Sequence, residues 1–200
     1  MLTGGKTILL ACLCAGISVI FCIMLHSFGK VFKTFSPNPY ERVFFGGTVI
    51  LCITLILGTT RYSGTGIEVI ASAIGGTARN SDFFWKMLFT AITLACGYKG
   101  GEIIPSFFVG ATFGCVIAPV LGLSSSLGAA IGMVSVFCGV TNCPIASLLI
   151  ALELFGKAPI LYFLLAIAIS YMLSGYYSLY KTQIIAVSKY KNEYVDKKTH

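Results

Sequence analysis

Charged side chains are scarce in this sequence. Asp, Glu, Lys and Arg make up 10% of its 200 residues, whereas soluble domains carry roughly 25%. Hydrophobic residues make up 56%, and the mean hydropathy is +0.89. Because so few polar side chains cannot cover a water-soluble domain, most of the surface must lie against lipid or a protein partner. The composition therefore excludes a soluble protein and predicts an integral membrane protein.

Motifs of enzymes and of metal sites are also absent. The sequence contains neither HExxH nor GxSxG, and its two histidines are His26 and His200. We assign His26 to the edge of a loop. The eight cysteines all lie in or beside apolar segments, without paired zinc-site spacing, and are typical of small hydrophobic residues. We therefore predict no catalytic activity, no metal, no cofactor and no disulfide framework.

Acidic residues are few, and the basic excess is unevenly placed. The net charge is +7, and the last twenty residues contain five lysines: Lys181, Lys189, Lys191, Lys197 and Lys198. Three more basic residues, Lys30, Lys33 and Arg42, flank a polar stretch after the first hydrophobic segment. Lys and Arg are enriched on the cytoplasmic side of membrane proteins. We therefore expect a membrane domain over 1–185 and a basic cytoplasmic tail over 186–200, with no nucleic-acid partner.

Long uninterrupted hydrophobic runs are rare, although apolar segments are many. Segments 7–25 and 43–58 approach or reach the length that crosses a ~30 Å hydrocarbon layer. Segment 67–74 is too short, and a helix capped by Ser81 should run from Phe83 to about Cys96. Further helices are expected at 105–118, 128–140, 144–155 and 158–173. In total we predict about nine helical pieces, about four of them full length, with short and re-entrant helices among them.

The most informative break lies between Gly97 and Pro105. Backbone groups freed by a break inside a bilayer must face protein or a water-filled cavity. A helix that starts there, with Gly100, Gly101 and Pro105 at its beginning, directs amide donors and a positive dipole end at that cavity. Glu102 is costly at such a depth and is a functional candidate. The alternatives are that the glycines serve packing and that Glu102 pairs with Lys99 at the membrane edge.

Tyr180 is a second candidate, because its hydroxyl closes an apolar segment and can donate to an anion. Taken alone, however, it is more typical of an interfacial belt tyrosine, like Tyr176 and Tyr177.

Together these residues resemble the CLC family of chloride channels and transporters, which has a Gly-x-Phe-x-Pro signature at a helix start. Here the stretch reads Gly101-Glu102-Ile103-Ile104-Pro105, followed by an Asn142-Cys143-Pro144 helix start and by Leu179-Tyr180 before the tail. The resemblance implies an all-α fold consisting of the second inverted repeat of the CLC fold plus a preceding helix. It also implies an anion site formed by the backbone at Gly101, Glu102 and Ile103 and by the hydroxyl of Tyr180.

Two departures from the family pattern concern the choice of anion. Ile103 replaces the usual phenylalanine, and Glu102 is acidic where chloride members have an apolar residue. Glu102 with Phe108 six residues later is similar to the fluoride/proton antiporter branch, where these positions would serve proton coupling or selectivity. Chloride or fluoride, and channel or antiporter, remain open alternatives.

The first two family signatures, with the gating glutamate, do not occur in the sequence. The resemblance thus implies that a missing N-terminal half supplies the other side of the site, and that the assembly is a homodimer in a lipid bilayer. We expect a fragment, a split subunit or a decayed copy of a CLC-type transporter. The alternative is a non-transporting truncated pseudo-transporter or membrane scaffold.

Overall fold

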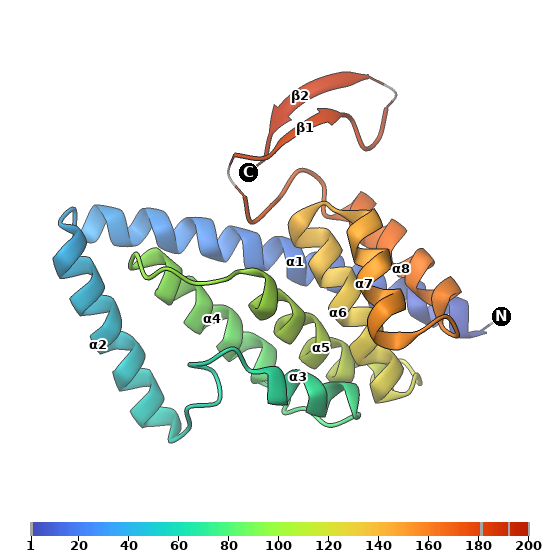
Figure 1. The fold of residues 1–200 in the computed structure, drawn as a ribbon, viewed down its shortest axis with the longest axis horizontal. Coiled ribbons are helices and arrows are strands. Elements are labelled where there is room, and N and C mark those ends of the chain that lie inside the picture. The colour runs from blue at the N-terminus through green and yellow to red at the C-terminus, as the bar shows by residue number, and fades with distance from the viewer. Residues whose placement is uncertain (1, 181, 192, 200) are drawn as a thin grey trace.

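The computed structural model describes residues 2–180, 182–191 and 193–199, and these form eight α-helices and one antiparallel pair of strands (Figure 1). The elements are α1 (Leu2–Phe35), α2 (Pro39–Leu57), α3 (Ile67–Ile74), α4 (Asp82–Ala95), α5 (Ile103–Val120), α6 (Ser125–Thr141), α7 (Pro144–Phe155), α8 (Ile160–Leu173), β1 (Ile184–Val187) and β2 (Tyr194–Lys198).

The predicted helical membrane fold is confirmed, but the counts differ. Nine helical pieces were expected, and the described residues form eight. Three of the described helices, α1, α2 and α5, are long and apolar enough to cross a membrane, where we expected about four. The last apolar helix, α8, has only 14 residues, and at ~1.5 Å per residue it is too short for a perpendicular span.

Helix α1 is much longer than predicted. It was expected over 7–25, but it continues to Phe35. No proline or paired glycine interrupts 26–35, Lys33 in the last turn suits the helix dipole, and Pro37 prevents further extension. The chain turns sharply at Asn38, whose side chain accepts a hydrogen bond from the backbone N–H of Tyr40 at 3.2 Å. As a result, His26 lies inside a helix and not at a loop edge.

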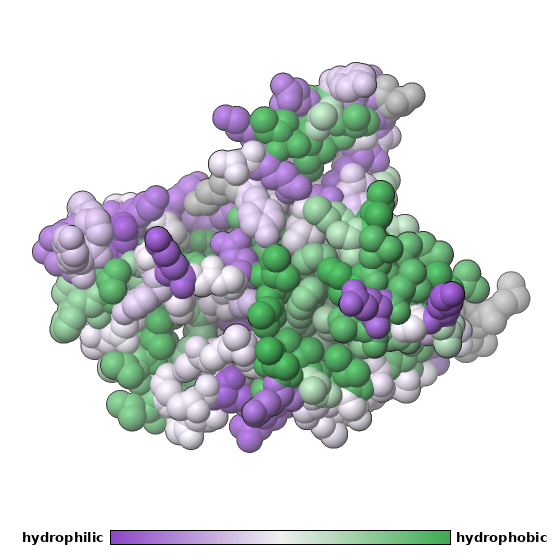
Figure 2. All heavy atoms as spheres, in the orientation of Figure 1, coloured by the Kyte–Doolittle hydropathy of each residue, from purple (hydrophilic) through white to green (hydrophobic). Residues whose placement is uncertain are grey.

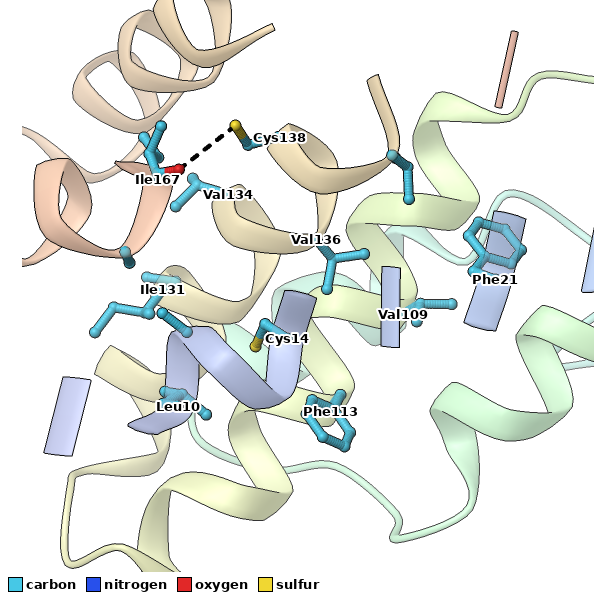
Figure 3. Packing of buried hydrophobic residues seen from close by; sticks show 14 of the residues in the cluster. Leu10, Cys14, Phe21, Val109, Phe113, Ile131, Val134, Val136, Cys138 and Ile167 are labelled. Atoms are coloured by element: carbon cyan, nitrogen blue, oxygen red, sulfur yellow. Dashed lines mark hydrogen bonds between the residues drawn. The ribbon is translucent and has the colours of Figure 1, made fainter. Parts of the chain in front are cut away.

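The core lies where α1 crosses α4, α5, α6 and α8. Leu10, Phe21, Val109 and Ile131 are fully buried there (Figure 3), and so is Phe163 on α8. A second apolar cluster on the other side of α5 contains Tyr62, Val69, Phe89, Phe108 and Met133. The two clusters therefore pack against α5 from both sides.

Apolar side chains also cover much of the outer surface. Figure 2 shows hydrophobic residues over the face of the bundle, with hydrophilic residues gathered at the α1–α2 connection and around the hairpin. Ile145 and Leu161 are each 75% exposed, on α7 and α8, and Ile56 on α2 is 84% exposed. Apolar surface of this extent requires lipid or protein around it.

The tail contains more structure than expected. Strands β1 and β2 form an antiparallel hairpin that stands on the helical bundle (Figure 1). Lys189, between the strands, places its ammonium over the ring of Tyr171 at 4.1 Å and donates to Tyr171 O at 2.8 Å. It also donates to the side chains of Asn142 and Ser174. These bonds satisfy acceptors at the ends of α6 and α8 and attach the hairpin to the bundle.

Candidate functional site

The break before α5 lies where the sequence predicts it, with small shifts at its end. Helix α5 begins at Ile103 rather than Pro105, and Pro105 occupies the first turn, where a backbone donor is not needed. Ser81 precedes α4 as predicted, but its side chain makes no capping hydrogen bond. Similarly, α6 begins at Ser125 and not at Gly128. The amide groups at the start of α5 therefore belong to Glu102, Ile103 and Ile104.

The start of α5 opens on free space. Gly100 and Gly101 are exposed, and a Cβ placed on Gly101 would meet no atom within 4 Å. The side chain of Ile103 is 42% exposed. Among the described residues Gly101 therefore does not mediate close helix packing, and an approaching ligand would meet bare backbone.

Two cavities flank this start. The first, of about 210 Å³, lies between Gly100, Gly101 and Pro105 on one side and Tyr62 and Lys86 on the other. The second, of about 230 Å³, places Glu102 opposite α1, with Leu94 and Ala95 of α4 and Leu179 completing its wall. The α1 residues that line it are Leu25, His26, Gly29 and Lys33. Glu102 is partly buried and lines a cavity with both polar and apolar walls.

Phe108 is placed apart from both cavities. Its side chain is fully buried, with its ring centroid 6.5 Å from that of Tyr62. The ammonium of Lys86 lies 5.1 Å from the centre of the Phe108 ring. Phe108 therefore contacts residues that line the first cavity, and it is not a lining residue of either cavity.

Lys86 was not recognised in the sequence. It is 3% exposed, and its ammonium donates to the carbonyls of Tyr62, at 3.2 Å, and of Gly64. The lone ion pair among the described residues is Arg61–Asp82, so Lys86 is held by carbonyls and not by a carboxylate. The sequence did contain a signal that would have identified Lys86, because it is the single charged residue within the 83–95 segment.

Tyr180 belongs to a segment that is fixed by its backbone. Leu179 N donates to Val140 O at 2.9 Å, and Thr199 Oγ1 donates to Tyr180 O at 2.7 Å. The Tyr180 side chain is 42% exposed. The structure brings Leu179, its neighbour, into the same cavity wall as Glu102, but Tyr180 itself does not line that cavity.

His26 is the residue that sequence analysis misplaced. Its Nε2 lies 3.4 Å from Leu179 O, and the side chain lines the cavity that contains Glu102. Because α1 was expected to end at residue 25, His26 and Lys33 were not recognised as residues of one helix face.

Comparison with known proteins gives a consistent family. The model of the family described as voltage gated chloride channel matches residues 4–175. A chloride/fluoride channel protein of Pseudomonas syringae pv. tomato is 35% identical over 178 residues, which cover 86% of this chain and 39% of that protein. A solved crystal structure of a CLC-type fluoride/proton antiporter matches with a TM-score of 0.87 and 29% identity, over 90% of this chain and 46% of that one.

The chain therefore spans less than half the length of each of these two relatives. The family model nevertheless covers most of the sequence, and the helical arrangement agrees with that of the solved relative. This chain belongs to the CLC family of voltage-gated chloride channels.

Proposed function

We propose that the chain supplies one side of an anion pathway through a membrane, and that chloride or fluoride binds at the start of α5. The relatives are a chloride/fluoride channel protein and a fluoride/proton antiporter, which supports anion transport as the general activity. The observation that carries the proposal is the open start of α5, where exposed glycines precede a helix and Glu102 faces a cavity.

The backbone explains why an anion would bind there. The first-turn amides of an α-helix have no carbonyl partner within the helix, and the helix dipole adds positive potential at this end. In the proposed site the backbone at Gly101, Glu102 and Ile103 donates to the ion, and the hydroxyl of Tyr180 approaches from the other side. Amide and hydroxyl donors replace the water that the ion loses on entering the membrane.

Glu102 gives the site its preference and its coupling to protons. A protonated carboxyl donates a hydrogen bond, and fluoride, being small, accepts such a bond more strongly than chloride does. Once the anion has left the site, the same carboxyl can carry its proton through the membrane. Phe108 is buried away from both cavities, so it acts on selectivity indirectly. It does so through its contact with Lys86, which lines the first cavity. We therefore favour fluoride/proton exchange over a chloride channel.

The remaining part of the pathway lies on a separate N-terminal half in this proposal. The basic residues of the α1–α2 connection and of the 186–200 tail face the cytoplasm, and residues 1–185 form the membrane domain. Assembly as a homodimer would cover some of the exposed apolar side chains of α7 and α8.

Ion flux from liposomes tests the proposal. The chain is reconstituted alone and together with the N-terminal part of the Pseudomonas relative that precedes the matched region. A fluoride electrode, a chloride electrode and a pH dye then record efflux of each anion and uptake of protons. We expect fluoride efflux above that of empty vesicles, accompanied by proton uptake, when both parts are present.

Absence of fluoride and chloride flux from a monodisperse complex of both parts would contradict the proposal. Chloride flux without proton movement would retain the anion pathway and would overturn the fluoride/proton assignment.

A further inference from the structure

We propose that the first cavity holds a second anion-binding site, in which the ammonium of Lys86 binds a small halide next to the start of α5. This inference rests on the proposed function, because it adds a binding step on the way to the backbone at Gly101. The second site is distinct from the one that uses Glu102 and Tyr180, since neither of these residues lines the first cavity.

Lys86 is a buried cation without a carboxylate partner in the described part of the chain. It is 3% exposed, and the lone ion pair among the described residues is Arg61–Asp82. Asp82, one turn before Lys86 on α4, accepts hydrogen bonds from three other donors. A charge buried away from water is unfavourable unless an opposite charge lies near it. An anion beside Lys86 would therefore meet a charge that the described side chains do not neutralise.

The ammonium of Lys86 keeps one donor for a ligand. It donates to the carbonyls of Tyr62, at 3.2 Å, and of Gly64, and an ammonium has three N–H groups. The Phe108 ring, with its centre 5.1 Å from the ammonium, adds a cation–π attraction but carries no net charge. The two carbonyls thus hold the ammonium in place, and its third N–H can donate to an anion.

Four serine and threonine hydroxyls line the first cavity with Lys86, and two of them can donate to an ion. The hydroxyls of Thr90 and Thr93 already donate to backbone carbonyls of α4, at 2.8 and 2.7 Å. Ser63 and Thr65 are exposed, so their hydroxyls can turn toward an ion. Lys86 is the one charged residue among the described residues that line this cavity. These donors suit a halide, which accepts hydrogen bonds and cannot donate them.

The size of the first cavity favours a small ion. Its volume is about 210 Å³, and a molecule of liquid water takes ~30 Å³. A halide with part of its hydration shell fits into this space. Gly100 and Gly101 line the wall opposite Lys86, so the bound halide would lie beside the start of α5.

A wider cavity adjoins the first one at the loop before α3. This loop cavity has a volume of about 770 Å³ and is lined by residues 59–61, 64–69 and 79, most of them exposed. Gly64 and Thr65 line both cavities. The ammonium of Lys86 donates to Gly64 O and lies 3.8 Å from the position that a Cβ on Gly66 would take. Lys86 therefore lies at the wall that the two cavities share, and the loop cavity opens this wall to the surface.

The charges around the loop cavity favour the entry of an anion. Arg61 and Arg79 line it together with one acid, Glu68. The guanidinium of Arg61 pairs with Asp82 at 2.9 Å, whereas Arg79 is exposed and contacts Asp82 through its backbone N–H. With Lys86 this group contains three cations and two carboxylates, so one positive charge remains. An excess of positive charge in a cavity raises the local concentration of anions and their rate of association.

Lysine side-chain signals test binding without any transport. The chain is labelled with nitrogen-15 at the lysine side chains and studied in detergent micelles, and substitution of Lys86 by Met or Arg identifies the Lys86 signal by its loss. We expect this signal to be that of an ammonium and to move, with saturation, when sodium fluoride or sodium chloride replaces sodium gluconate. Lys157 is exposed and lines neither cavity, so its signal should move little.

A Lys86 signal that neither halide moves would overturn the proposal. Equal movement of the Lys86 and Lys157 signals would show a general effect of salt, and it would overturn the proposal as well.

Fluoride flux through the reconstituted complex of both parts tests whether the bound ion lies on the transport path. Methionine has nearly the length of lysine without its charge, and apolar replacement of a buried charge commonly preserves the fold. We expect Lys86→Met to raise the fluoride concentration at half-maximal flux roughly tenfold, through loss of a charge-assisted hydrogen bond. Lys86→Arg, which keeps the charge, should lose less affinity than Lys86→Met. Lys157→Met is the matched control and should keep the unmodified value.

An unchanged half-maximal concentration in Lys86→Met would overturn the proposal. Equal losses in Lys86→Met and Lys86→Arg would show that Lys86 only supports the 62–64 loop, which would overturn it too.

Arg79→Gln tests the loop cavity as the entrance. It removes an exposed charge and keeps the backbone N–H that binds Asp82. At low ionic strength we expect flux at low fluoride concentration to fall about threefold, and at ~0.5 M salt we expect no difference, because salt screens exposed charges. An unchanged flux at low ionic strength, or a loss that salt does not alter, would overturn the assignment of the loop cavity as the entrance.

Failure of the Lys86 site and failure of the proposed function give different results. A complex without anion flux whose Lys86 signal still responds to halide would contradict the proposed function and support the Lys86 site. A transporting complex whose Lys86 signal does not respond would overturn the Lys86 site and leave the anion site at the start of α5.

Discussion

Gly110 and Gly132 bring the backbones of α5 and α6 into direct contact. A Cβ on Gly132 would lie 2.3 Å from Gly110 O, and one on Gly110 would lie 2.4 Å from Gly132 O. One turn further along α5, a Cβ on Gly114 would lie 2.1 Å from Gly128 O. Small residues allow such close approach between membrane helices. Because α5 carries the candidate site at its start, this crossing determines where the site lies.

Substitution at the crossing should destabilise the fold. Gly114→Ala forces a methyl group against the α6 backbone, which cannot move aside as a flexible side chain can, and overpacking of this kind costs about 1–3 kcal/mol. We expect a clearly lowered thermal midpoint in detergent, followed by circular dichroism. Gly16→Ala on α1 is the control, since a Cβ there meets nothing within 4 Å. Equal midpoints for the two variants would contradict the packing described.

The buried carboxylate of Asp82 holds the two loops around α3. It accepts hydrogen bonds from Arg61 Nη2 at 2.9 Å, Tyr62 Oη at 2.8 Å and Arg79 N at 3.1 Å, and it is fully buried. Asp82→Ala leaves these donors without their acceptor, although Arg61 is partly exposed to solvent. We expect a loss of about 2–3 kcal/mol in the free energy of unfolding.

Denaturant titration of the purified protein measures this loss. Glu68→Ala, which removes an exposed carboxylate from α3, should change stability little. A similar effect for both substitutions would show that the Asp82 network is not a main support of the loops.

Docking of the tail hairpin should strengthen as the pH rises from about 8. Burial lowers the pKa of Lys189 from 10.5 to about 8, so between these values the undocked tail binds more protons than the docked tail. Stability rises with pH wherever the undocked form binds more protons. Hydrogen exchange of the β1 and β2 amides, corrected for intrinsic pH dependence, should slow across this window. Lys189→Met should remove the trend, and a trend that persists in this variant would exclude Lys189 as its source.

Much of the fold could be predicted because lipid imposes simple rules on sequence. The apolar segments, the break at Gly97–Pro105 and the helix start at Pro144 follow from hydropathy and from the chemistry of glycine and proline. The length of α1 was missed because Lys30 and Lys33 suggested a polar connection, although nothing between His26 and Phe35 breaks a helix. Charge marks the end of an apolar segment, but it does not mark the end of a helix.

The candidate site was predicted in part for a similar reason. Glu102 and the glycines before it are neighbours in sequence, so local chemistry was sufficient to identify them. His26 and Lys86 contact residues far away in the chain, namely Leu179 and the 62–64 loop. Such contacts arise only from the crossing of α1, α4 and α5, which no local pattern contains. The hairpin was missed because the tail was interpreted from its lysines alone, and Ile184 to Val187 shows no alternation of polar and apolar residues.

The most direct measurement is the number of protons moved per fluoride ion by Glu102→Gln in liposomes that contain both parts of the pathway. Glutamine keeps the size of the side chain and an amide donor for the anion, but it cannot carry a proton. We expect fluoride to cross while proton uptake falls to the level of empty vesicles. Glu68→Gln, which changes an exposed residue of α3, should keep the unmodified ratio. An unchanged proton-to-fluoride ratio in Glu102→Gln would contradict the assignment of Glu102 as the proton-carrying group at the start of α5.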